Sequence, residues 1–309
     1  MPSPTPNSPR PGDWLLFVMA PVFFSSNLIF GRGIIGEIGL FITAFIRWFG
    51  SGLIMVPILY ATWSVARGFV RNHTWLWLWL GFLSIGICGG LVYWALTLTT
   101  ASNATLIYTT SSLFIILLQW AFAGRRISLR ELSGMIVAFA GVAAIVLRGD
   151  LAALTHMRFN IGDFGMLTAA IAFAVYSVLL RRPAAQAVPP LTLFGLMSFS
   201  GSLVLLPPAI WEYWDGGLLP STLNAWSMIA GIILLASLAA FFCFQHTVRV
   251  FGPATAGATL YMMPPVSIIM AVIFLGETFE TYHAGGIILV LGGVILATAK
   301  MKRPRLRNA

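Results

Sequence analysis

The sequence has few charged side chains and almost no cysteine. Charged residues make up 9% of the 309 residues and hydrophobic residues 59%, whereas soluble domains average about 25% and 45–50%. A soluble fold cannot bury so much apolar surface, so the composition predicts a polytopic membrane protein. Cys88 and Cys243 both lie within apolar segments, which excludes a disulfide framework, and no metal-ligand spacing is present.

The sequence also lacks the patterns that support catalysis or cofactor binding. The four histidines are scattered, the phosphate-binding pattern GxxxxGK[ST] is absent, and no Asp or Glu falls at the middle of an apolar segment. A proton pump usually carries such an intramembrane acidic or histidine relay. We therefore predict a protein that is not an enzyme, has no cofactor or metal, and moves its ligand by uniport.

Ten apolar segments are present, each near the ~20 residues that a helix needs to cross a bilayer. They predict an all-α polytopic membrane protein with ten transmembrane helices. The predicted spans are 13–32, 40–62, 75–99, 102–123, 128–148, 161–181, 189–211, 224–249, 254–276 and 282–300.

Lys and Arg are distributed unequally between the two sides of these spans. Only Arg32, Arg148 and Arg158 fall on one side, while Arg47 lies inside the second span. The positive-inside rule places the basic side, with both termini, in the cytoplasm. The net charge of +9 is thus a topology and membrane-surface signal, and no nucleic-acid partner is expected. The basic side holds Arg10, Arg67, Arg71, Arg125, Arg126, Arg130, Arg181, Arg182, Arg249, Lys300, Lys302, Arg303, Arg305 and Arg307.

The second half of the chain repeats the first. Gly162-Asp163 follows Gly12-Asp13 by 150 positions, and FGSGLIMVP at 49–57 matches FSGSLVLLP at 199–207. Because each copy holds five spans, the copies must cross the membrane in opposite directions, as in many secondary transporters. The predicted parts are a disordered cytoplasmic tail at 1–12, a first repeat at 13–148, a linker at 149–160, a second repeat at 161–301 and a basic cytoplasmic tail at 302–309.

Two features within the spans predict how the helices pack and where a buried charge points. Glycines of the fifth and tenth spans recur on one helix face and predict close helix packing; they are Gly134, Gly141, Gly285, Gly286, Gly292 and Gly293. Arg47 is expected to extend to the headgroups, with an ion pair or a gate as the alternative.

Polar and aromatic residues gather on equivalent spans of the two copies, namely the first, third and fourth and the sixth, eighth and ninth. Such groups line substrate paths, although singly each can also bond its own helix or anchor at the interface. The predicted substrate-binding residues are Asn27, Tyr93, Trp94, Tyr108, Ser112, Tyr176, Ser237, Phe241, Tyr261 and Met263.

A proline pair, Pro264 and Pro265, interrupts the ninth span. Proline removes a backbone donor, so the carbonyls of Leu260 and Tyr261 lose helix partners. The pair predicts a hinge, with a static kink as the alternative. Ser112 stands where the first copy would have its proline, so the copies are predicted to be unequally kinked.

These residues resemble the drug/metabolite transporter superfamily in its ten-span EamA type, over about 13–300. The first copy departs from the pattern at Ser112 and Arg125, and Glu277 is expected to cap the ninth span. The motifs that carry the resemblance are Ala95-Leu96 … Thr100-Ala101-Ser102-Asn103-Ala104, Pro264 … Leu275-Gly276-Glu277 … Gly286 … Gly293, and Phe45-x-Arg47.

The resemblance implies a bacterial inner-membrane exporter of neutral or aromatic amino acids, similar to the aromatic amino-acid exporters of that superfamily. It would work by alternating access around a central cavity. A cavity without fixed charge, as the sequence predicts, suits a zwitterion, and aromatic walls suit an apolar side chain. The alternatives are export of cationic aromatic drugs such as viologens, or a channel or scramblase-like pore. Both a monomer and a homodimer fit the sequence.

Overall fold

The computed structural model describes residues 9–34, 36–124, 127–150, 160–276 and 278–298, and every regular element in these ranges is helical. The predicted tail residues 1–8 and 302–309, most of the linker, and Glu277 lie outside them. The elements are α1 (Pro11–Gly33), α2 (Leu40–Ile54), α3 (Val56–Ala61), α4 (Trp63–Asn72), α5 (Thr74–Gly81), η1 (Phe82–Leu91), α6 (Val92–Leu96), α7 (Ala101–Thr109), α8 (Ser111–Ala123), α9 (Leu129–Val146), α10 (Ile161–Leu179), α11 (Pro183–Gln186), α12 (Pro190–Trp214), α13 (Leu223–Gly231), η3 (Ile232–Ala239), α14 (Ala240–Phe251), α15 (Pro253–Tyr261), α16 (Met263–Leu275) and α17 (Thr281–Thr298).

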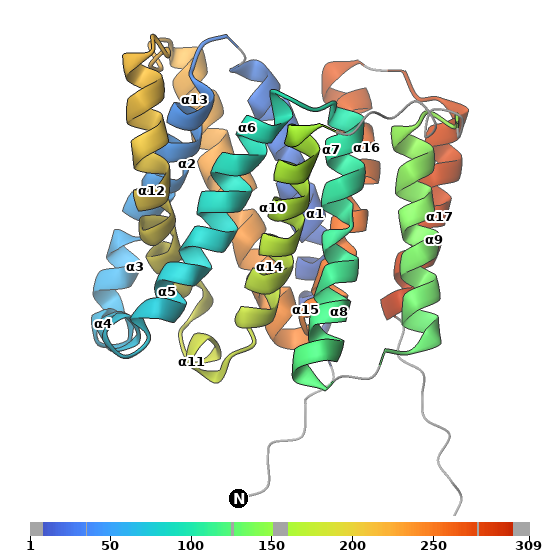
Figure 1. Cartoon of the computed structure of the whole chain (residues 1–309), viewed down its shortest axis with the longest axis horizontal. Helices are drawn as coiled ribbons and strands as arrows, with labels where there is room; N and C mark the ends of the chain where they lie inside the picture. The colour runs from blue at the N-terminus through green and yellow to red at the C-terminus, as the bar shows by residue number, and fades with distance from the viewer. Residues whose placement is uncertain (1–8, 35, 125–126, 151–159, 277, 299–309) are drawn as a thin grey trace, which may run out of the picture.

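All ten predicted segments are helical over most of their length. Within the described ranges, nine helical stretches are long and apolar enough to cross a membrane. The second segment differs, because its apolar helix α2 has only 15 residues and ends before Met55. The short helices α3 and α4 continue it, and α4 lies at the same end of the bundle as α11 (Figure 1).

The ninth segment is broken where the proline pair predicts. Helix α15 ends at Tyr261, Met262 separates the two helices, and Pro264 and Pro265 lie in the first turn of α16, where a missing N–H costs least. The carbonyl of Met263 accepts a 3.1 Å hydrogen bond from Ser25 of α1, which ties the break to the first helix.

A break also interrupts the fourth segment, where the sequence offers no proline. It lies at Thr110, between α7 and α8. The hydroxyls of Thr109 and Thr110 donate to the carbonyls of Leu106 and Ile107, three residues earlier. Such side-chain bonds compete with the helical backbone bonds and bend the helix. The two threonine hydroxyls therefore account for the break in the fourth segment, as the prolines do for the break in the ninth.

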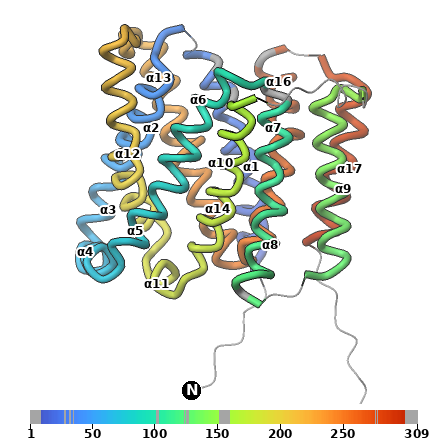
Figure 2. Tube along the Cα trace, viewed as in Figure 1, coloured from blue at the N-terminus to red at the C-terminus, as the bar shows by residue number. Residues whose placement is uncertain are grey.

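The helices form one bundle whose two edges are helix pairs. Helices α9 and α17 lie side by side at one edge, and α2 packs against α12 at the other (Figures 1 and 2). A Cβ on Gly293 would come within 2.4 Å of the Ala138 backbone nitrogen, so only glycine permits this approach of α17 to α9. Gly285 and Gly292 face open space within this chain and do not take part in the contact between α9 and α17.

Candidate functional site

A cavity of about 480 Å³ lies between the two edge pairs. The broken helices contribute much of its wall, because α7, α15 and α16 all reach it near their ends. The wall is mostly apolar and aromatic. It is lined by Phe24, Asn27, Arg47, Trp48, Ser84, Cys88, Val92, Leu96, Ala104, Thr105, Tyr108, Thr109, Ile145, Val146, Met166, Phe173, Phe241, Leu260, Met263, Pro264, Ser267 and Ile268.

Arg47 of α2 places a guanidinium in this wall. The side chain is only 8% exposed. Its Nε donates to Ser237 Oγ at 2.6 Å, and Nη2 donates to the Ala236 carbonyl at 2.9 Å. Its Nη1 donates to Asn27 Oδ1 at 3.2 Å and to the Tyr93 hydroxyl at 3.4 Å.

This geometry corrects two predictions. Arg47 does not extend to the headgroups, because neutral oxygens from α1, α6 and η3 hold it inside the bundle. The cavity therefore carries a fixed positive charge, where a neutral one was predicted. The sequence did hold a signal for this inward placement, namely the position of Arg47 within a predicted span. Charged residues inside a membrane span usually face the protein interior and mark a functional site.

Two π-helical segments shape the wall around Arg47. η1 supplies Ser84 and Cys88 to the cavity, and η3 supplies two acceptors of the guanidinium, Ser237 and Ala236. The wider π turn shifts the backbone bonding pattern and re-aims side chains, which is why such turns recur at functional sites. In η3 the Ser237 hydroxyl donates to the carbonyl of Ile232, five residues earlier, and so its oxygen stays available to Arg47.

Several predicted substrate-binding residues lie in the cavity wall. Asn27, Tyr108, Phe241 and Met263 line it, as does the predicted hinge residue Pro264. Tyr108 lies with its ring centroid 6.0 Å from that of Phe173, which also lines the cavity. These residues come from α1, α7, α14 and α16, so elements distant in sequence meet at one space.

The remaining predicted residues are placed outside the cavity wall. Tyr93 and Ser237 contact it only through Arg47. Ser112 is fully buried and donates to the Gly257 carbonyl at 2.7 Å, which joins α8 to α15. Tyr176 and Tyr261 are also fully buried within hydrophobic clusters. Trp94 packs against a cluster of Ala95, Ala104 and Met166, and Pro265 follows Pro264 in α16.

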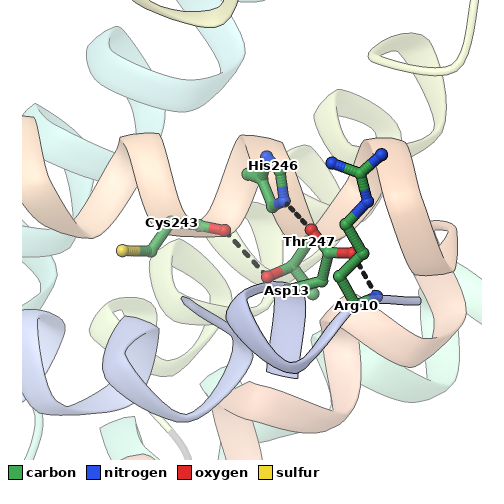
Figure 3. A network of polar contacts seen from close by, with 5 residues as sticks. All are labelled: Arg10, Asp13, Cys243, His246 and Thr247. Carbon is green, nitrogen blue, oxygen red and sulfur yellow. Dashed lines mark hydrogen bonds and ion pairs between the residues drawn. The ribbon is translucent and has the colours of Figure 1, made fainter. Parts of the chain in front are cut away.

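A second polar contact, missed from the sequence, lies at one end of the bundle. His246 Nε2 of α14 lies 2.7 Å from Asp13 Oδ1 at the start of α1 (Figure 3). The other carboxylate oxygen of Asp13 accepts from the Arg10 backbone N–H at 2.8 Å. The two residues are 233 positions apart, and no sequence pattern pairs them.

The family comparison matches most of the chain. The model of the EamA-like transporter family matches residues 12–147 and again residues 160–299. A crystal structure of another protein superimposes with a TM-score of 0.78 at 19% identity, covering 94% of this chain and 97% of that one. That likeness concerns the fold.

Several similar proteins from different organisms are named as transporters. An uncharacterised transporter of Archaeoglobus fulgidus is 28% identical over 291 residues, covering 93% of this chain and 97% of its own length. The uncharacterised transporter YetK of Bacillus subtilis is 22% identical over 298 residues, covering 95% and 88%. A probable terminal-alkyne amino-acid exporter of Streptantibioticus cattleyicolor is 27% identical over 222 residues, covering 69% and 71%.

Proposed function

The chain belongs to the EamA-like transporter family, and from this membership we propose that it exports neutral or aromatic amino acids and related small metabolites across a bacterial inner membrane. The cavity carries the proposal, since about 480 Å³ lies within the ~300–1,000 Å³ of small-molecule sites. Its aromatic side chains, such as Trp48 and Phe241, suit an apolar substrate body. The similarity to a probable amino-acid exporter points to the same class.

The proposed mechanism is alternating access by uniport. The protein would cross the membrane ten times as two inverted five-helix repeats, with both termini in the cytoplasm. The breaks at Thr110 and Met262 support this, because two interrupted helices meet where Ser112 bonds Gly257. Such interruptions near a central cavity are characteristic of transporter folds. Pro264 and Pro265 would act as the hinge.

Counterflow in proteoliposomes tests the proposal. An unlabelled amino acid inside the vesicles should accelerate uptake of the same amino acid, labelled, from outside. The panel of compounds consists of the twenty amino acids and a viologen-type dication. Viologen transport is disfavoured, because Arg47 places a positive charge in the wall. Absence of counterflow for every amino acid would refute the main proposal, and uptake without accelerated exchange would indicate a channel. An imposed pH gradient that changes the final accumulation would refute uniport.

A pair of variants connects transport to the cavity. Val92 lines it, so Val92→Trp should fill the space and abolish counterflow. Val65 of α4 is 41% exposed, so Val65→Trp should leave counterflow unchanged. Equal activity of the two variants would show that the substrate path lies elsewhere.

A further inference from the structure

The buried guanidinium of Arg47 has neutral partners only. Two hydroxyls, one side-chain amide and one backbone carbonyl accept its bonds, and within the described ranges no carboxylate pairs with it. Four of its five N–H groups are thus used, and one on Nη2 remains. A buried charge without a counter-charge is costly, and a bound anion would offset part of that cost.

One neighbour of Arg47 leaves hydrogen-bond donors beside it. Asn27 and Tyr93 each accept from Nη1 through an oxygen. Among the described residues none accepts from the amide hydrogens of Asn27, so these hydrogens can serve as donors at the cavity wall. Together with the guanidinium they form a group of donors that an oxyanion would satisfy, and the charge strengthens such bonds.

Two hydroxyls of the cavity wall already have acceptors within the protein. The hydroxyls of Ser84 and Thr109 donate to carbonyls of their own helices. Among the described lining residues, Arg47 alone is charged. Phe173, Phe241 and Ile268 supply apolar surface elsewhere in the wall. The cavity thus combines one cationic site with an apolar remainder.

We propose that Arg47 and Asn27, which both line the cavity, form a subsite for the carboxylate of the transported molecule, and that Tyr93 holds the guanidinium in place from behind. The subsite would select monocarboxylates with an apolar or aromatic body, amino acids among them, and would reject the corresponding amines. This inference rests on the proposed function in one respect, namely that the cavity is the transport site. Met197 stands 150 positions after Arg47 and is fully buried, so the second copy offers no matching charge.

The test compares ligands that differ only in their charged groups. L-phenylalanine has both groups, 3-phenylpropionate lacks the amine, and 2-phenylethylamine lacks the carboxylate. Each is scored by the concentration that half-inhibits L-phenylalanine counterflow, and by thermal stabilisation of the purified protein in detergent. Inorganic phosphate is included to distinguish a general anion site.

The two acids should act at concentrations at least about tenfold lower than the amine, as expected for hydrogen bonds to a charged group. Arg47→Met should remove this preference, and Arg47→Lys should weaken it. Arg67 is exposed on α4, so Arg67→Met, the same substitution outside the cavity, should keep the preference.

Three outcomes would overturn the inference: equal action of amine and acid, phosphate as effective as 3-phenylpropionate, or an unchanged preference in Arg47→Met. If Arg47→Met fails to fold, the ranking in the unmodified protein and in Arg47→Lys decides. If no amino acid shows counterflow, the proposed function fails, whereas thermal stabilisation by 3-phenylpropionate still tests the subsite.

Discussion

The hydroxyl of Ser237 accepts a 2.6 Å hydrogen bond from Nε of Arg47, a residue 190 positions earlier. The bond joins α2 to η3 across the interior of the bundle. It fixes the guanidinium in the cavity wall, together with the carbonyl of Ala236. The position of the one charge in the wall therefore depends on a serine of the opposite half of the chain.

Removing this acceptor should destabilise the protein. Ser237→Ala leaves a buried, charged N–H without a partner, which costs about 1–3 kcal/mol. Thermal unfolding in detergent measures the loss. Ser227→Ala is the matched control, because Ser227 is exposed on α13 in the same segment. Similar melting temperatures for the two variants would contradict a structural role for the bond.

The glycine contact between α9 and α17 predicts opposite effects at adjacent positions. Gly293→Ala would force a Cβ against the Ala138 backbone and should destabilise by about 1–3 kcal/mol. Gly292 faces open space, so Gly292→Ala should be neutral or stabilising by up to ~1 kcal/mol through helix propensity. Thermal unfolding of both variants distinguishes them, and equal melting temperatures would disprove close packing.

The contact between Asp13 and His246 should give a small coupling energy between α1 and α14. The side chains are 19% and 26% exposed, so solvent should screen the contact, and a double-mutant cycle with Asp13→Asn and His246→Gln, measured by thermal unfolding, should give a small favourable coupling. Additive effects of the two substitutions on the melting temperature would show that the contact adds no stability.

Burial predicts which site residues an aqueous thiol reagent reaches. Single cysteines replacing Asn27 or Tyr108, which line the cavity, should react. Cysteines replacing Tyr176 or Tyr261, which are fully buried, should be protected in this conformation.

The labelling needs a background without Cys88 and Cys243, because Cys88 itself lines the cavity. Substrate added before labelling should slow the reaction at Asn27→Cys and Tyr108→Cys. Uniform protection of all four positions would refute a solvent-filled site here.

Much of the fold could be predicted from the lengths of the apolar segments alone. A segment of ~20 apolar residues forms a helix in lipid because its backbone groups must bond internally, and all ten predicted segments are helical. The proline pair also located one break correctly. The break at Thr110 was missed, because threonine hydroxyls bend a helix only in some surroundings and carry no unique signal.

The candidate site was predictable only in part. Repeat comparison directed attention to segments that do contribute to the cavity, and Tyr108, Phe241 and Met263 lie in its wall. It did not distinguish them from Tyr176 and Tyr261, since a tyrosine in a cavity wall and one in a packed core look alike in sequence.

The sequence by itself determined that the chain is an apolar helical bundle, because composition and spacing act locally along each helix. The tertiary structure alone decided that Arg47 turns inward and that Asp13 meets His246. These contacts join residues far apart in sequence: Ser237 is 190 positions from Arg47, and His246 is 233 positions from Asp13. Which oxygens surround a charge is set by how helices pack, and that is where the proposed specificity of the cavity arises.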